Sequence, residues 1–223
     1  MQLTPAPGRY VRQAGALKNC GTWMKLWGGR PLIVGGETAL KVAGAVLTQS
    51  LVESGLEPAG TLWYGGQCSA ANIQRVARAA RSQKADLLVG VGGGRALDTV
   101  KAAAAELNLP LVTVPTIAAT CAAWTSVAVH YSDDGVFIAL KPAVSPALVV
   151  VDTDIVAHAP VRLLSAGMGD TLAKWVELAA TFTPEKRNAA TEAAHTLARL
   201  TLDVLFRSGA AARRAASVGA TTP

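Results

Sequence analysis

Apolar residues in the first two thirds of the chain form short runs, separated by stretches with helical spacing. Runs such as Asp86–Val91 (DLLVGV) show no alternation of polar and apolar residues, as expected for strands covered on both faces of a parallel sheet. Strands or short extended pieces are predicted over 30–36, 62–64, 86–91, 111–114 and 148–151. Helices are predicted over 37–51, over 70–81 with Ser69 as N-cap, and over 95–107.

The pattern changes near residue 160, after which no further strand is predicted. Two long helices rich in Ala, Leu and Arg are expected there, over 161–180 and 188–216. Strands that alternate with helices predict an α/β fold with a parallel sheet and helices on both faces. We therefore expect a Rossmann-like α/β domain over residues 1–159, followed by the start of an incomplete, all-helical domain over 160–223.

Composition and charge narrow the class of protein. A hydrophobic fraction of 51% with only 16% charged residues excludes an intrinsically disordered chain. The longest stretch without a charged residue, 107–132, contains Pro110 and Pro115, so no membrane span is expected. The net charge of +6 is scattered and not concentrated on one element, so a nucleic-acid partner is not expected.

The three cysteines form no CxxC or CxxH pair, which argues against a structural zinc site. The first twenty residues lack the apolar core of a signal peptide. An odd number of cysteines without a secretion signal predicts reduced thiols and a cytoplasmic location.

The most informative segment is 87–101, LLVGVGGGRALDTVK, in which a strand leads through Gly92, Gly93 and Gly94 into a helix. Without Cβ atoms, glycines let backbone N–H groups approach an anion closely, and a helix N-terminus adds unpaired donors and partial positive charge. The segment therefore predicts a pyrophosphate-binding loop, although it matches neither GxGxxG nor a Walker loop. The alternative is a tight turn that binds nothing, but three consecutive glycines exceed what a turn needs.

Two further segments carry candidate chemistry. Residues 114–131 place several hydroxyl groups directly after a buried strand, where ligands of open α/β sheets bind; the alternative is a polar loop with helix caps. Asp170 follows Gly169 at the start of a predicted helix, where a carboxylate acts either as an N-cap or as a metal ligand.

These segments together resemble the iron-containing alcohol dehydrogenase superfamily, in its glycerol dehydrogenase branch. The matching pieces are GVGGGRALDTVKA, VPTIAATCAAWTS, VVVDTDIVAHAPVRLLSAGMGD, TLAKWVE and WYGGQCS. Within the branch, TIAATCAAWT and GDTLAKW are most similar to the 2-hydroxycarboxylate dehydrogenases. The resemblance implies a dinucleotide-binding α/β domain, a helical domain and an active site in the cleft between them.

The resemblance implies NAD or NADP as cofactor and a set of residues that would hold it. The pyrophosphate would lie on Gly92, Gly93, Gly94 and Arg95, with Ala96, Leu97 and Asp98 beside it. The adenine and ribose side would be lined by Thr116, Ile117, Ala118 and Ala119, and the nicotinamide end by Thr125, Val127 and Tyr131.

The resemblance also implies a divalent metal, Zn2+ or Fe2+, with Asp170 as its first ligand and as a substrate contact. Such an ion lowers the pKa of an alcohol, whose carbon then gives hydride to the nicotinamide. The family's two histidine ligands lie in a downstream motif that this chain does not match, and His130, His158 and His195 are expected to be structural or surface residues. The implied partners are a small alcohol or a 2-hydroxy or 2-oxo acid, and further copies of the chain in a homo-oligomer.

Two positions depart from the family pattern. Gly36 stands where NAD-preferring members carry an aspartate, which favours acceptance of NADP unless Glu37 substitutes for it. Cys121 replaces an aspartate that contacts glycerol, which favours a 2-oxo acid as substrate. Two alternatives remain: a truncated, catalytically inactive dinucleotide-binding paralogue, and a carbocycle-forming synthase related to dehydroquinate synthase, which TIAAT and GDTLAKW match less well.

Overall fold

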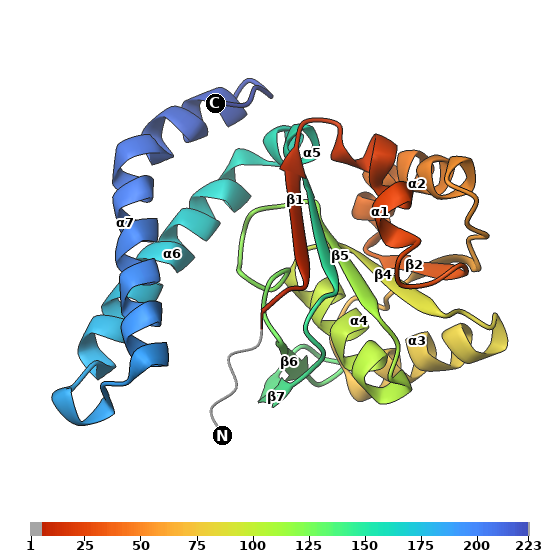
Figure 1. The fold of residues 1–223 in the computed structure, drawn as a ribbon, viewed down its shortest axis with the longest axis horizontal. Coiled ribbons are helices and arrows are strands. Elements are labelled where there is room, and N and C mark those ends of the chain that lie inside the picture. Colours follow the sequence, from red (N-terminus) through yellow and green to blue (C-terminus); the bar gives the residue numbers. More distant parts are fainter. Residues whose placement is uncertain (1–5, 223) are drawn as a thin grey trace. The chain divides into compact units, whose positions relative to one another are not determined.

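The computed structural model describes residues 6–222, which form two compact units (Figure 1). Of the described residues, the α/β unit contains 6–117 and 121–156, and the helical unit contains 118–120 and 157–222.

The α/β unit is built on six parallel strands in the order β1-β8-β5-β4-β2-β3. This sheet confirms the predicted fold class. Its first strand was not predicted, because its sequence RYVRQ has mostly polar, exposed side chains and lacks an apolar run. The strands are β1 (Arg9–Gln13), β2 (Pro31–Gly35), β3 (Gly60–Trp63), β4 (Leu87–Gly92), β5 (Leu111–Pro115) and β8 (Leu148–Asp152).

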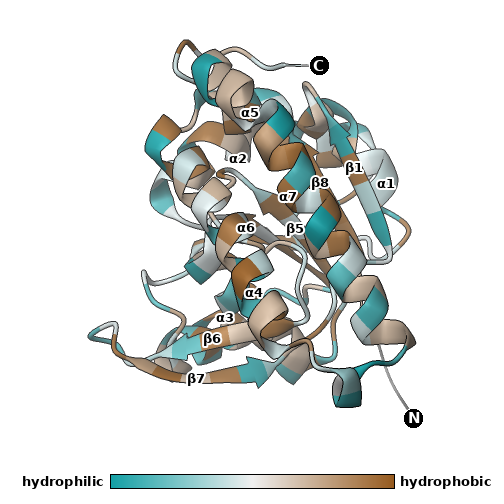
Figure 2. Ribbon diagram, turned by 90° about the vertical axis from the view of Figure 1, so that its left-hand side faces the viewer, coloured by the Kyte–Doolittle hydropathy of each residue, from teal (hydrophilic) through white to brown (hydrophobic). Residues whose placement is uncertain are grey.

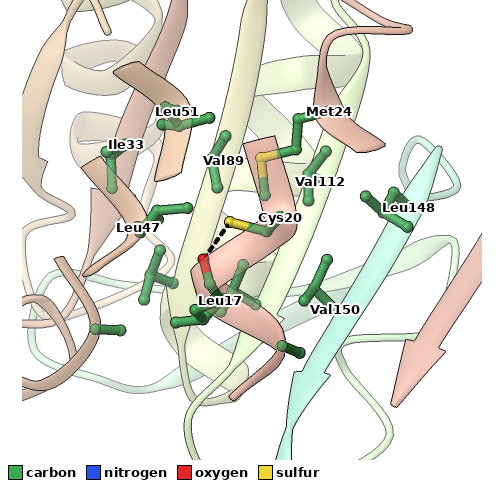
Figure 3. Packing of buried hydrophobic residues seen from close by; sticks show 14 of the residues in the cluster. Leu17, Cys20, Met24, Ile33, Leu47, Leu51, Val89, Val112, Leu148 and Val150 are labelled. Carbon is green, nitrogen blue, oxygen red and sulfur yellow. Dashed lines mark hydrogen bonds between the residues drawn. The ribbon is translucent and has the colours of Figure 1, made fainter. Parts of the chain in front are cut away.

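Helices cover both faces of the sheet because successive strand residues point to opposite sides. Ile33 and Val89 pack with Leu17 and Leu47 on one face (Figure 3), whereas Leu32 joins the cluster on the other face. The first face is covered by η1 (Ala16–Asn19), α1 (Cys20–Met24) and α2 (Glu37–Glu53), and the second by α3 (Ala70–Ser82) and α4 (Gly94–Leu107).

The short elements η1 and α1 were not predicted, and a carboxylate far away in the sequence positions them. Asp152, at the end of β8, accepts hydrogen bonds from the backbone N–H groups of Gly15 (3.0 Å) and Leu17 (3.1 Å). Cys20, which follows directly, is fully buried, and its burial raises the pKa of the thiol to about 11.

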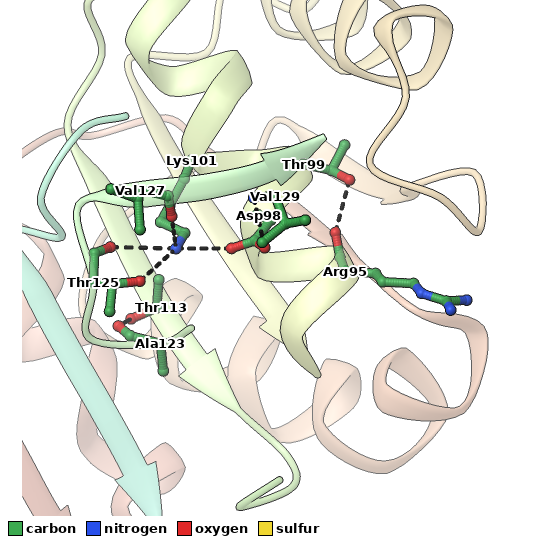
Figure 4. Close-up of polar contacts among 9 residues, drawn as sticks. All are labelled: Arg95, Asp98, Thr99, Lys101, Thr113, Ala123, Thr125, Val127 and Val129. Atoms are coloured by element: carbon green, nitrogen blue, oxygen red, sulfur yellow. Dashed lines mark hydrogen bonds and ion pairs between the residues drawn. The ribbon is translucent and has the colours of Figure 1, made fainter. Parts of the chain in front are cut away.

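A two-stranded antiparallel hairpin is formed by β6 (Val127–Tyr131), at the end of the segment 114–131 for which a polar loop was the alternative interpretation, and by β7 (Phe137–Pro142) beyond it. Lys101 of α4 holds it, because its fully buried ammonium group donates to the hydroxyl and the carbonyl of Thr125 (3.1 and 3.2 Å) and to the carbonyl of Val127 (Figure 4). The same ammonium lies 2.8 Å from Asp98, whose carboxylate also accepts the N–H of Val129 at 3.1 Å.

The helical unit confirms the two predicted long helices, α6 (Val161–Thr181) and α7 (Ala189–Ala216). Asn188 caps α7 through a reciprocal capping box with Thr191. The His195 ring of α7 stacks on Phe182 at 4.5 Å and lies 5.1 Å from Trp175 of α6, so His195 belongs to an aromatic cluster. The remaining helices are α5 (Thr153–His158), which contains the boundary between the units, and η2 (Pro184–Lys186). Within residues 6–222, no helix combines the length and the apolarity needed to cross a bilayer.

Lys101→Met is expected to lower the free energy of unfolding by about 3 kcal/mol, because it leaves the Asp98 carboxylate buried without its cation. Asp98→Asn combined with Lys101→Met should recover part of the loss. The matched control is Lys174→Met, which removes an exposed ion pair to Asp170 and should change stability by less than about 1 kcal/mol. Urea denaturation measures all three, and equal losses for the two single variants would contradict the structural role of Lys101.

Candidate dinucleotide-binding site

The candidate site lies where the order of the strands reverses. From β2 the chain continues to β3, toward one edge of the sheet. From β4 it continues to β5, toward the opposite edge. In open α/β sheets, ligands bind beyond the carboxyl ends of the strands at this switch point. Gly36 follows β2 there, and Gly93 follows β4.

The end of β4 adopts a backbone conformation that disfavours side chains, and it lies beside the end of β2. Gly92 has φ of 141°, which is unfavourable for residues with a Cβ atom. A Cβ on Gly92 would lie 3.2 Å from the Ala96 Cβ and 3.7 Å from the Gly36 nitrogen. The Gly36 N–H in turn donates to the carbonyl of Val91 at 3.3 Å. The glycines of the two predicted strand ends are therefore neighbours in space.

The N-terminus of α4 provides backbone donors at this point. The helix begins at Gly94, one residue earlier than predicted, with Gly93 as an N-cap that has no side chain to satisfy the first N–H groups. The first backbone hydrogen bond of the helix joins the Leu97 N–H to the Gly93 carbonyl at 3.1 Å. The N–H groups of residues 94–96 precede it, have no partner within the helix, and carry the partial positive charge of the helix dipole.

The structure brings Arg95 and Tyr131 together beside these donors. The Arg95 side chain is exposed, and its guanidinium lies over the Tyr131 ring, 5.6 Å from the centroid. The Tyr131 N–H donates to the Cys68 carbonyl at 2.9 Å, so the hairpin is fixed at this end as well. A permanent cation therefore stands at the rim of the turn.

Several predicted cofactor residues have structural partners in the fold. Ala96, Leu97 and Asp98 are buried, and the Asp98 carboxylate bonds to Lys101 and to the hairpin backbone. The Thr125 hydroxyl and the Val127 carbonyl both accept from Lys101. Sequence reasoning missed Lys101, although its spacing from Asp98 is that of an ion pair on one helix face.

Tyr64 and Thr116 stand around the end of β2 and the turn after β4. A Cβ on Gly36 would lie 3.7 Å from a ring carbon of Tyr64, an ordinary contact distance. The Tyr64 N–H donates to the Gly35 carbonyl and its hydroxyl to the Gly66 carbonyl, at 3.0 and 2.6 Å, and burial raises its pKa. The Thr116 N–H donates to the Gly92 carbonyl at 3.2 Å. Tyr64 was absent from the predicted site, although it lies in the segment WYGGQCS.

Of the remaining predicted site residues, one borders the turn after β4, one is exposed, and two belong to the helical unit. A Cβ on Gly93 would come within 2.7 Å of the Ile117 Cδ1, so Ile117 borders the turn. Cys121 is exposed, and its carbonyl accepts the Trp124 N–H at 2.9 Å. Ala118 and Ala119 belong to the helical unit.

Asp170 does not cap a helix, so the N-cap interpretation was wrong: α6 begins at Val161, which places Asp170 in its middle. Its carboxylate lies 3.7 Å from the ammonium of Lys174, one helical turn further on. In the described part of the chain, no three His, Cys, Asp or Glu side chains are grouped as metal ligands would be. Catalytic zinc sites use about three protein ligands, so these residues do not fit a complete metal site.

Comparison with known proteins extends these observations. The family model for iron-containing alcohol dehydrogenases matches residues 7–153. Glycerol dehydrogenase of Pseudomonas putida is 38% identical over 98% of this chain, and the match covers 61% of that protein. Hydroxycarboxylate dehydrogenase A of Escherichia coli K12 is 45% identical over 55% of this chain and 34% of its own length.

The fold agrees with these matches. The crystal structure of glycerol dehydrogenase from Schizosaccharomyces pombe superposes with a TM-score of 0.88 at 27% identity, over all of this chain and 57% of that one. This chain thus spans about 60% of the length of the glycerol dehydrogenases that it matches. Together, the glycine-lined switch point, the fold and the family match show that the chain belongs to the iron-containing alcohol dehydrogenase family.

Proposed function

We propose that the α/β unit binds NAD(H) or NADP(H), with the pyrophosphate at the N-terminus of α4. In the whole protein, this cofactor would exchange hydride with a small alcohol or a 2-hydroxy acid. The observation that carries the proposal is the meeting of two glycine-ended strands, β2 and β4, at the switch point of the sheet. The absence of Cβ atoms there lets the two strand ends and the start of α4 lie close together.

Each residue of the turn has a part in the proposed binding. The N–H groups of residues 94–96 would donate to the phosphate oxygens, and the Arg95 guanidinium would add a charge-assisted contact. Ile117 would give an apolar wall beside Gly93. Asp98 and Lys101 act indirectly, because they fix the hairpin that carries Tyr131. The nicotinamide ring, when bound, supplies the hydride acceptor or donor.

The substrate class rests on Cys121 and on the similarity to hydroxycarboxylate dehydrogenase A. A neutral thiol at this position would not repel the carboxylate of a 2-oxo acid, whereas an aspartate would. We therefore propose a 2-hydroxy or 2-oxo acid in preference to glycerol.

The proposed metal ligand, Asp170, is one carboxylate with a lysine ammonium beside it. The described residues complete no metal site around it, so no catalytic step of this chain is derived through a metal. Binding of the dinucleotide without turnover is accordingly the proposal for residues 1–223 by themselves.

Gly93→Val is expected to raise the dissociation constant for NADH at least tenfold, about 1.4 kcal/mol, because the branched side chain would displace Ile117 and crowd the proposed phosphate position at the start of α4. Gly93 has φ of −93°, so the backbone tolerates a side chain, and only the end of the flexible Ile117 side chain must shift to make room for it. Gly44→Val, at an open position on α2, is the matched control and should bind NADH as the parent does. Fluorescence titration measures the affinities. An unchanged affinity in Gly93→Val would refute the proposed phosphate site.

Gly36→Asp tests the choice of cofactor. The backbone at Gly36, with φ of −74° and ψ of 151°, suits any residue, and a Cβ has room beside Tyr64. The parent chain should bind NADP+ within about tenfold of NAD+, a difference of about 1.4 kcal/mol. The added carboxylate should weaken NADP+ binding at least tenfold through repulsion of the 2′-phosphate, while Gly36→Asn, of nearly equal size but neutral, should not. Equal effects of both variants in equilibrium titrations would show that charge at this position does not decide the cofactor.

Residues 1–223 are expected to bind the cofactor without measurable dehydrogenase turnover, with Zn2+ or Fe2+ added. The reason is that Asp170 by itself would compete poorly with water for the ion. Steady-state assays with 2-oxobutyrate and with glycerol test this expectation. Metal-dependent turnover that disappears in Asp170→Asn would contradict it and would show that further ligands reach this carboxylate.

A further inference from the structure

Arg95 is a cation beside the switch point that no carboxylate of the fold neutralises. Its side chain is exposed, and none of the ion pairs found within residues 6–222 includes it. The acid nearest to it in sequence on the same helix, Asp98, is paired with Lys101 at 2.8 Å. Figure 4 shows the Arg95 side chain pointing away from this pair. The positive charge of Arg95 is therefore available to an anionic ligand.

Two tyrosines stand close to this guanidinium. It lies over the Tyr131 ring, 5.6 Å from the centroid. Burial raises the pKa of Tyr64, and the positive charge of Arg95 acts in the opposite direction, so the guanidinium also lies near the Tyr64 hydroxyl. Both rings pack against the apolar cluster on the second face of the sheet, and the Tyr64 hydroxyl is fixed on the Gly66 carbonyl at 2.6 Å. A long side chain restricted in this way loses less conformational entropy when it binds a ligand.

The hairpin that carries Tyr131 is fastened at this end. The Tyr131 N–H donates to the Cys68 carbonyl at 2.9 Å, and the hydroxyl of the next residue, Ser69, donates to the Asp133 carboxylate. β6 also packs against α4, and Figure 2 shows the hairpin directly below this helix. The helix that carries Arg95 and the strand that carries its aromatic partner are therefore held together.

Tyr64 connects this cation with the end of β2. Its N–H donates to the Gly35 carbonyl at 3.0 Å, and a Cβ on Gly36 would lie 3.7 Å from its ring. In dinucleotide-binding α/β folds, an acidic residue near the pyrophosphate turn binds the ribose 2′-hydroxyl of NAD, whereas a nearby arginine accommodates the 2′-phosphate of NADP. Here the residue that follows the neighbouring strand is Gly36, without a carboxylate, and the charged side chain nearby is Arg95.

Glu37 is the one acid next to Gly36 in sequence, and it lies on a different helix face of the sheet. It begins α2, which covers the first face, whereas Tyr64 and Tyr131 pack on the second. Arg95 forms no ion pair with Glu37 in the described part of the chain. The carboxylate of Glu37 therefore does not neutralise the guanidinium.

We propose that Arg95, held in place by Tyr64 and Tyr131, binds the 2′-phosphate of NADP(H) and so raises the affinity for NADP(H) relative to NAD(H). The inference rests on the proposed function, because it adds one contact to the same bound cofactor. The N–H groups of residues 94–96 remain the donors to the pyrophosphate, so NAD(H) binds without help from the guanidinium. A planar guanidinium donates to two phosphate oxygens at once, which a lysine ammonium cannot match.

Arg95→Gln tests the proposal in equilibrium titrations with NADP+ and NAD+. The dissociation constant for NADP+ should rise about tenfold or more, while that for NAD+ should change less than about threefold. The retained NAD+ affinity shows at the same time that the variant is folded. Arg95→Lys, which keeps the charge without the planar pair of donors, should recover part of the lost NADP+ affinity. The matched control is Arg78→Gln, at an exposed arginine of α3, which should leave both affinities unchanged.

Titration with 2′,5′-ADP and 5′-AMP isolates the 2′-phosphate from the pyrophosphate. The parent chain should bind 2′,5′-ADP about tenfold or more tightly than 5′-AMP, and Arg95→Gln should remove this difference. An unchanged NADP+ affinity in Arg95→Gln overturns the inference. Equal losses for NADP+ and NAD+ also overturn it but leave the proposed function intact, since they place Arg95 on the pyrophosphate. If the parent chain binds neither cofactor, the proposed function fails and the inference fails with it.

Discussion

The close approach of the turn after β4 to the end of β2 is the constraint on which the site depends. Gly92 adopts a φ of 141°, which disfavours any residue with a Cβ atom, and such an atom would also lie only 3.2 Å from the Ala96 Cβ. This approach allows α4 to begin immediately after the strand, with its first N–H groups directed at the switch point of the sheet. The packing of the strand end and the arrangement of the candidate phosphate donors thus both follow from one backbone conformation.

Helix α4 joins this site to the hairpin. Its N-terminus carries the candidate phosphate donors, and Asp98 and Lys101 further along hold the backbone of β6. Burial of both charges is tolerable because each is the other's counter-ion and the remaining donors of the ammonium find carbonyl and hydroxyl oxygens. The hairpin is therefore attached to α4 through buried polar contacts of β6 in an otherwise apolar interior. Its second strand, β7, pairs with no other described strand than β6.

The family assignment and the residues present support different parts of the function. The turn proposed to bind the dinucleotide lies within residues 7–153, the segment that the family model matches. The proposed metal ligand Asp170 lies outside that segment, in a helix with no buried residue. The described residues therefore support cofactor binding more strongly than metal binding.

The sequence by itself determined strands β2, β3, β4, β5 and β8, the helices between them, and the glycine turn. Buried parallel strands and the starts of helices leave strong local patterns in a sequence, which is why these elements could be predicted. It did not predict β1, η1, α1 or the hairpin. These elements have short or polar sequences and are held by distant partners: Asp152 binds the backbone at Gly15 and Leu17, and Lys101 binds Thr125 and Val127. Local patterns carry no information about such pairings. For the same reason only the tertiary structure showed that Asp98 and Thr125 contact the buried Lys101 and that Tyr64 stands beside Gly36.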